Sequence, residues 1–191
     1  RLLNKLKPKS KILIIAGSDS SGGAGIQADI KTTSYFNGYA MTAITAITAQ
    51  NTIGVQSIYP LPKEIVMEQI NSITTDLSPD IVKIGMLADL DIIEYISKKI
   101  SNYKIVLDPV MVATSGDVLV SDEVVSSIKN NLINKSFLIT PNIYEAEILS
   151  ENKINCLEDQ IEAGKNLLKL GCKHVLVKGG HGNSDIINDV L

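Results

Sequence analysis

The sequence predicts an α/β protein with a mostly parallel sheet that helices cover on both faces. Two observations support this fold class. Apolar, β-branched runs of strand length recur along the chain, and stretches with apolar residues at helical spacing separate most of them. Strands and helices that alternate in this way are typical of βαβ units, whose parallel strands are buried on both faces. The 191 residues, 45% of them hydrophobic, suffice for a single domain, residues 1–191, with one core.

The predicted strands are apolar runs that end in polar residues or glycine. In chain order they are KILIIA, the run from Tyr39 to Ala49, DIVKIG, KIVLD, FLIT and KHVLVK. The second run overlaps the sequence TAITAITAQ, residues 42–50, which is rich in small residues. This composition predicts a strand against which another segment packs closely.

The predicted helices are amphipathic stretches between these strands. Their apolar stripes are Ile26, Ile30 and Thr33; Val66, Ile70, Ile73 and Leu77; and Val124, Ile128 and Leu132. Gly38 and Gly171 stand where glycine is expected just beyond the end of a helix.

Composition argues against several classes of partner. The net charge of −3 and the aromatic content of 4%, without Trp, argue against nucleic acid, whose phosphates attract cations and whose bases stack on aromatic rings. No apolar run approaches the roughly 20 residues that cross a bilayer. The apolar run after the basic residues 1–10 is also shorter than the core of a signal peptide, about 7–15 residues. We therefore expect a cytoplasmic protein without a membrane partner, with residues 1–10 as an N-terminal extension.

The two cysteines, Cys156 and Cys172, are too few for a disulfide framework. Neither belongs to a CxxC pair, so we expect reduced thiols rather than metal ligands.

In an open α/β sheet, ligands bind beyond the carboxyl ends of the strands. The segments that follow the predicted strands are Gly17-Ser18-Asp19, Gln50-Asn51, Gly85-Met86, Asp108-Pro109, Pro141-Asn142 and Gly179-Gly180-His181. Most of these residues are polar or glycine, so we expect them to meet in one crevice.

The first of these segments opens the glycine-rich stretch AGSDSSGGAGIQAD, residues 16–29. It lacks the lysine of a Walker A loop and does not fit GxGxxG. One interpretation is a flexible connection between a strand and a helix. The other is a loop that lets a small ligand approach the backbone and then opens a helix N-terminus that favours an anion. Asp29 follows within that helix, where an acidic residue also compensates the helix dipole.

Three further motifs each allow two interpretations. Asp108 in VLDPVM is either part of a turn or a carboxylate that organises Mg²⁺ near a nucleotide. Asn142 and Glu145 in TPNIYEAE have the spacing of a helix capping box, or lie at a metal and phosphates. Lys178 in LVKGGH reaches a phosphate, or is an exposed lysine at the sheet edge. No nucleophile is clearly paired with a histidine, so the sequence does not indicate a catalytic triad.

Taken in order, the motifs resemble those of a known family. AGSDSSGGAGIQAD, AITAQNTIGVQ, KIGML, VLDPVM, TPNIYEAE and LVKGGH are similar to the hydroxymethylpyrimidine/phosphomethylpyrimidine kinases of thiamine biosynthesis, within the ribokinase-like superfamily. The resemblance runs from about Lys11 to the end of the chain. It implies a three-layer αβα fold and a homodimer that uses ATP and Mg²⁺. It also implies phosphorylation of 4-amino-5-hydroxymethyl-2-methylpyrimidine and then of its monophosphate.

The resemblance also implies roles for residues that match the family motifs. Gln50 would hydrogen-bond the ring and amino edge of the pyrimidine. Gly17 and Asp29 would line the same pocket, and Met86 and Val110 would contact the pyrimidine. In this interpretation the glycine-rich stretch lacks a phosphate lysine because it forms a wall of the acceptor pocket.

At the other end of the site, Asp108 and Glu145 would hold Mg²⁺, and Asn142, Glu145 and Lys178 would bind ATP and its phosphates.

The sequence departs from the family pattern in one respect. Ribokinase-like kinases carry a GTGC- or GAGD-like motif, whose backbone amides form an anion hole and whose Cys or Asp is the candidate base. Residues 1–191 contain no such motif, and the sequence stops within what looks like a strand, residues 186–191. We therefore expect a chain that is truncated or incomplete relative to the family, and the catalytic base stays unassigned. A truncated chain would bind the pyrimidine weakly, with little or no turnover.

Two alternative functions follow. A related branch of the family phosphorylates pyridoxal or pyridoxine, but the sequence TAQNTIGVQ favours the pyrimidine. The missing motif instead favours a non-catalytic pyrimidine-binding module.

Overall fold

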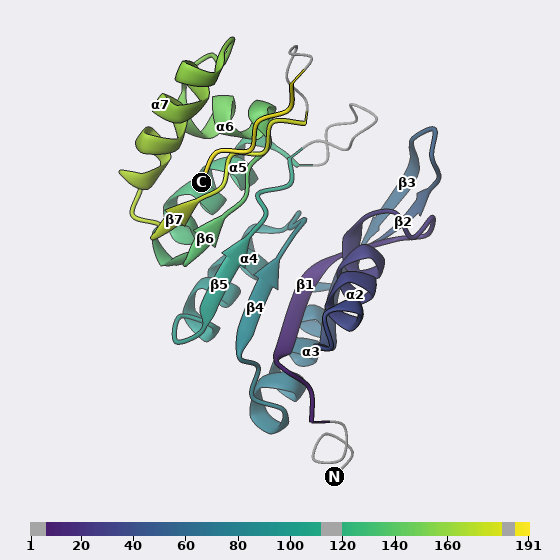
Figure 1. Cartoon of the computed structure of the whole chain (residues 1–191). Coiled ribbons are helices and arrows are strands. Elements are labelled where there is room, and N and C mark those ends of the chain that lie inside the picture. The colour runs from purple at the N-terminus through teal and green to yellow at the C-terminus, as the bar shows by residue number, and fades with distance from the viewer. Residues whose placement is uncertain (1–6, 112–119, 181–185) are drawn as a thin grey trace.

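A computed structural model describes residues 7–111, 120–180 and 186–191. These parts of the chain form a seven-stranded sheet with the order β3-β2-β1-β4-β5-β6-β7 (Figure 1). The strands are β1 (Lys11–Asp19), β2 (Tyr39–Gln50), β3 (Val55–Pro60), β4 (Ile81–Ile84), β5 (Lys104–Leu107), β6 (Leu138–Ile139) and β7 (His174–Val175). All neighbouring pairs are parallel except β2 and β3. The predicted α/β fold with a mostly parallel sheet is confirmed.

The helices connect these strands. They are α2 (Gly25–Tyr35), α3 (Lys63–Asp76), α4 (Leu90–Lys99), α5 (Asp122–Asn131), α6 (Ile143–Ser150) and α7 (Leu157–Leu168), with a short 3-10 helix η1 (Ile133–Lys135). Within the described parts of the chain, no helix is both long and apolar enough to cross a membrane.

Two hydrophobic clusters show which face each helix covers. From β1, Leu13 and Ile15 pack into the larger cluster together with residues of α3 to α7. Ile14 and Ala16 point to the opposite face and pack with Ile26 of α2. Helix α2 therefore covers one face of the sheet and the other helices cover the opposite face, which gives three layers (Figure 1). Because β1 is buried on both faces, its sequence is continuously apolar rather than alternating.

The structure differs from the sequence prediction at β3, which the sequence does not reveal. This strand pairs antiparallel with β2 at the edge of the sheet and is largely exposed. Its sequence, VQSIYP, lacks a buried apolar run and ends in proline, a residue that sheets tolerate at their edges.

The predicted role of Gly38 is wrong. The left-handed residue after α2 is Asn37, with φ of 61°. Gly38 instead allows close packing, because a Cβ there would lie 2.8 Å from Cγ2 of Thr33. Gly171, by contrast, adopts a φ of 103° in the turn after α7.

The prediction of a strand at residues 186–191 is also wrong. Val190 forms an isolated antiparallel bridge with Val177, and the segment is not part of a named strand. Residues 1–6 and His181 of the last motif lie outside the described residues, and the division at residue 10 stays a prediction.

Candidate active site

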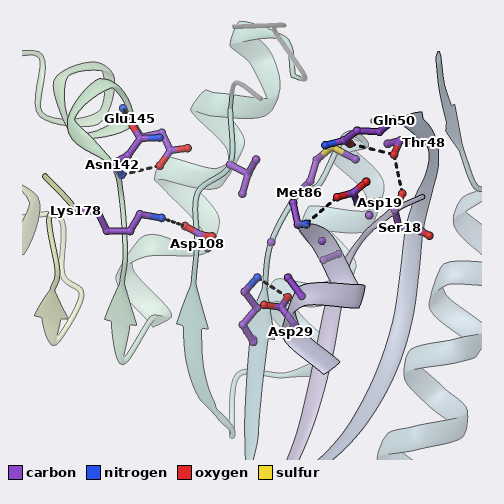
Figure 2. Close-up of a pocket in the computed structure, with 18 of the residues that line it drawn as sticks. Ser18, Asp19, Asp29, Thr48, Gln50, Met86, Asp108, Asn142, Glu145 and Lys178 are labelled. Atoms are coloured by element: carbon purple, nitrogen blue, oxygen red, sulfur yellow. Dashed lines mark hydrogen bonds and ion pairs between the residues drawn. The ribbon is translucent and has the colours of Figure 1, made fainter. Parts of the chain in front are cut away.

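A pocket of about 600 Å³ lies at the carboxyl ends of β1, β2, β4 and β5, between α2 and the start of α6 (Figure 2). It brings together the nine residues to which the sequence analysis assigns a role at a site, although these roles stay predictions. Its lining does not include four other residues that were expected in the crevice, Asn51, Pro109, Pro141 and Gly179. We call one side of it the α2 end, formed by Gly17, Asp29, Gln50 and Met86. The other side is the α6 end, formed by Asp108, Asn142, Glu145 and Lys178. Val110, which follows β5, also lines the pocket.

The glycine-rich loop between β1 and α2 is held by its own carboxylate. Asp19 is buried and accepts hydrogen bonds from the backbone N–H groups of Ser21, Gly23 and Ala24, at 2.7 to 3.0 Å, and from the Ser21 hydroxyl. Burial opposes ionisation of Asp19, but these hydrogen bonds outweigh it and lower the pKa of its carboxyl. Three N–H groups of the loop are therefore already occupied by this carboxylate and are not available to a phosphate.

The loop also needs glycine at one point for steric reasons. Gly25 starts α2 with a φ of +56°, and a Cβ there would lie 2.5 Å from the carbonyl oxygen of Gly17. Gln27, two residues later, accepts from the N–H of Asp19 at 2.9 Å and donates to Ser18 Oγ at 2.7 Å. The start of α2 is thus tied to the end of β1.

The α2 end combines an ion pair with close packing. Lys83 Nζ, from β4, lies 2.6 Å from Asp29 Oδ2, and each side chain is about one quarter exposed at 22% and 24%. Met86 is buried, and a Cβ on Gly17 would lie 2.7 Å from its Cε, so Gly17 leaves room for this side chain. The result is a narrow, partly apolar compartment with a fixed carboxylate at its side.

The α6 end gathers charged groups. Lys178 Nζ lies 2.8 Å from Asp108 Oδ1, and the Thr140 hydroxyl donates to the same oxygen at 3.1 Å. Asn142 and Glu145 form the capping box of α6, in which each side chain accepts from the other's backbone N–H at 2.8 Å. The capping-box interpretation is confirmed. The same two residues also line the pocket, and their role at a metal and phosphates stays a prediction.

Glu145 is the residue with the most perturbed acidity in this pocket. Burial raises the pKa of its carboxyl to about 7, and the nearby Asp108 adds to the increase. The hydrogen bond from Asn142 and the charge of Lys178 oppose the increase without cancelling it. Glu145 therefore changes its charge near neutral pH.

The carboxylates at the α6 end suit a magnesium ion that takes only one or two of its ligands from the protein. Among the described residues, no three His, Cys, Asp or Glu side chains gather into a metal-binding group. Mg²⁺ often uses only one or two protein carboxylates and takes its other ligands from phosphates and water. In the described structure both contacts of the Asp108 carboxylate use Oδ1, which leaves Oδ2 available for such a cation.

Comparison with known proteins identifies the family. The family model described as phosphomethylpyrimidine kinase matches residues 19–191. The chain belongs to the phosphomethylpyrimidine kinase family.

Individual relatives agree with this assignment. The hydroxymethylpyrimidine/phosphomethylpyrimidine kinase of Bacillus subtilis is 49% identical over 185 residues, which cover 95% of this chain and 68% of the relative. The crystal structure of phosphomethylpyrimidine kinase from Clostridium difficile superimposes with a TM-score of 0.85 at 43% identity, covering 95% of this chain and 84% of that one. The chain thus spans about two thirds of the length of the B. subtilis relative.

A pyridoxal kinase has a similar fold. The structure of the Staphylococcus aureus enzyme in complex with ADP gives a TM-score of 0.85 at 35% identity, covering 94% of this chain and 67% of that one. The fold is therefore shared with a kinase whose structure holds a nucleotide.

Ser18 and Asp19, from a segment expected in the crevice, line the pocket. The structure adds pocket residues of this phosphomethylpyrimidine kinase family member that the sequence analysis did not nominate, among them Thr48 and Lys83. The one signal for Lys83 is a charge inside the otherwise apolar run DIVKIG. Thr48 carries a weaker signal, since it is one of several threonines in TAITAITAQ.

Proposed function

We propose that this protein uses ATP to phosphorylate the hydroxymethyl group of 4-amino-5-hydroxymethyl-2-methylpyrimidine, and then phosphorylates the resulting monophosphate. One observation carries the proposal: a single pocket joins a partly apolar compartment at the α2 end to a cluster of charged groups at the α6 end. The similarity to kinases named for these substrates supports it.

The α2 end is suited to bind the acceptor. Gln50 would hydrogen-bond the ring and amino edge, Met86 and Val110 would contact the ring, and Gly17 and Asp29 would complete the wall. Polar groups arranged for one ring edge discriminate strongly, because a wrong ligand leaves them unpaired.

The α6 end is suited to bind the phosphates of ATP. Phosphoryl transfer requires mainly positioning and charge stabilisation, which a lysine and a carboxylate-bound cation supply. Lys178 and Asn142 would contact the nucleotide phosphates, and Asp108 and Glu145 would hold Mg²⁺. When bound, Mg²⁺ would neutralise charge on the transferring phosphoryl group.

We further place the enzyme in the cytoplasm as a homodimer. An exposed apolar surface on the β2–β3 hairpin supports association, with Ile47, Ile53 and Tyr59 exposed at 42%, 85% and 65%.

A side-by-side kinase assay tests the proposal. The protein is incubated with ATP and Mg²⁺ and with either the hydroxymethylpyrimidine or pyridoxal, and its intact mass is recorded. We expect preferred turnover of the pyrimidine, and we expect Gln50→Ala to abolish it while Gln56→Ala, on the exposed strand β3, leaves it unchanged. Pyrimidine turnover that survives in Gln50→Ala would contradict the pocket assignment.

Pyridoxal phosphorylation is the second candidate, favoured by the similarity to the S. aureus pyridoxal kinase. Preferred turnover of pyridoxal in the same assay would select it. Binding of the pyrimidine without phosphorylation of either compound would select a non-catalytic binding module.

A further inference from the structure

Thr48 lies between the glycine-rich loop and the side chain of Gln50 (Figure 2). It is buried, and its Oγ1 is 2.9 Å from the carbonyl oxygen of Ser18 and 3.2 Å from Oε1 of Gln50. Thr48 and Gln50 are two positions apart on β2, on either side of an irregularity in its pairing with β3, and the contact between their side chains shows that the two lie together.

The Thr48 hydroxyl has a single proton for these two contacts. The Ser18 carbonyl can only accept, and it is the closer partner, so the proton belongs there. The hydroxyl then presents a lone pair to the Gln50 amide. A half-turn about the last bond of the side chain exchanges Oε1 and Nε2, and the network favours the orientation in which Nε2 donates to Thr48.

The backbone of Gln50 is held independently of its side chain. The Ser20 hydroxyl accepts from the Gln50 N–H and donates to the Gln50 carbonyl, both at 2.8 Å. Ser20 thus fixes the backbone of Gln50, whereas the contact with Thr48 bears on the orientation of its side-chain amide.

We propose that Thr48 is a specificity-determining residue, because it holds the Gln50 amide with Nε2 toward Thr48 and Oε1 toward the pocket. In this orientation Oε1 accepts from an exocyclic amino group, and the second proton of Nε2 donates to the adjacent ring nitrogen. A 4-oxo ring presents the reverse pattern, a carbonyl beside a ring N–H. It would place acceptor against acceptor and donor against donor, which leaves the polar groups of the site unpaired.

The inference rests on the proposed function, in which Gln50 binds the amino edge of a pyrimidine. It predicts that removal of the Thr48 hydroxyl frees the Gln50 amide to turn. The amide could then pair with the donors and acceptors of either a 4-amino or a 4-oxo ring. Thr48→Val removes the hydroxyl and keeps the shape of the side chain, Thr48→Ser keeps the hydroxyl, and Thr48→Ala is a smaller replacement that adds no bulk.

The test is calorimetric titration of the full protein and its variants with 4-amino-5-hydroxymethyl-2-methylpyrimidine and with its 4-oxo analogue. We expect the wild-type protein and Thr48→Ser to prefer the amino compound by roughly 100-fold. Thr48→Val and Thr48→Ala should lower this preference by roughly tenfold while ADP affinity is unchanged. Thr74→Val is the matched control, since the Thr74 hydroxyl donates to Ile70 within α3, and it should keep the wild-type preference.

The outcomes separate this inference from the proposed function. If the wild-type protein binds neither compound, the proposed function fails. If it prefers the amino compound and the folded Thr48→Val and Thr48→Ala variants keep the same ratio, only the role of Thr48 is overturned. If Thr48 had a merely structural role, its replacement would lower the affinities for both compounds equally and leave their ratio unchanged.

Discussion

The two ends of the pocket each hold a lysine–aspartate pair, but in different surroundings. At the α2 end the Lys83–Asp29 pair, at 2.6 Å, lies near the neutral hydrogen-bond network of Ser18, Thr48 and Gln50. At the α6 end the Lys178–Asp108 pair, at 2.8 Å, lies near the buried carboxyl of Glu145.

This difference separates two kinds of recognition. The charges of the Lys83–Asp29 pair balance, so the α2 end can select a ligand by shape and by the pattern of its donors and acceptors. At the α6 end two carboxyl groups share one lysine, and burial of Glu145 raises its pKa to about 7. A bound cation would complete the balance of charge there, which suits binding of phosphates with Mg²⁺.

The largest effect is expected from Asp108→Asn. Loss of this carboxylate would remove the proposed Mg²⁺ ligand and leave Lys178 unbalanced, so kcat should fall by about 100- to 1,000-fold. The affinity for the pyrimidine should change little, because Asp108 lies at the α6 end. Steady-state kinetics and calorimetric titration of the pyrimidine would measure the two quantities.

Asp91→Asn is the control for Asp108→Asn. Asp91 pairs with Lys63, and its side chain is 58% exposed, so its loss should leave kcat unchanged. A kcat within threefold of wild type in Asp108→Asn would remove the distinction between the two ends.

The second prediction concerns stability against pH. Burial raises the pKa of Glu145 to about 7 from 4.5, so the folded protein binds a proton more tightly than the unfolded chain. The stability from this group is therefore fully present below pH 4.5 and is lost as the pH rises to about 7. The loss amounts to up to about 3 kcal/mol of unfolding free energy.

Urea denaturation without metal, between pH 5 and 8, would measure this effect. Glu145→Gln preserves a side chain that can close the capping box, and its unfolding free energy should lack this part of the pH dependence. Parallel pH profiles for the two proteins would show that Glu145 does not titrate in this range.

The α6 end also shows what sequence could predict. The rule that ligands bind beyond the carboxyl ends of parallel strands was sufficient to place Asp108 and Asn142 at one pocket. The spacing of Asn142 and Glu145 predicted the capping box, because that motif depends on local geometry alone.

The rest depended on contacts distant in sequence. Lys83 and Asp29 are 54 residues apart, and no local pattern shows that β4 and α2 bring them together. The edge strand β3 has too little buried surface for a clear apolar pattern. At Gly38 the expected helix cap was displaced, because Asn37 adopts the left-handed conformation one residue earlier.

The smallest effect is expected from Lys83→Met, at the α2 end. The substitution leaves Asp29 as a partly buried carboxylate without its partner, so affinity for the pyrimidine should fall by roughly tenfold. Affinity for ADP should not change, because the nucleotide phosphates would bind at the α6 end. Calorimetric titrations with the pyrimidine and with ADP would measure the two affinities. Lys83→Met should change the affinity for the pyrimidine, which Asp108→Asn should leave nearly unchanged.

Two variants sharpen this last comparison. Lys63→Met breaks the exposed pair with Asp91 and should leave both affinities unchanged, while Lys83→Arg keeps the charge and should restore part of the pyrimidine affinity. A lower melting temperature in Lys83→Met with unchanged pyrimidine affinity would mean that the pair only joins α2 to β4. Loss of pyrimidine affinity alone would mean that the balanced pair at the α2 end contributes to ligand selection, because the fold would then not depend on it.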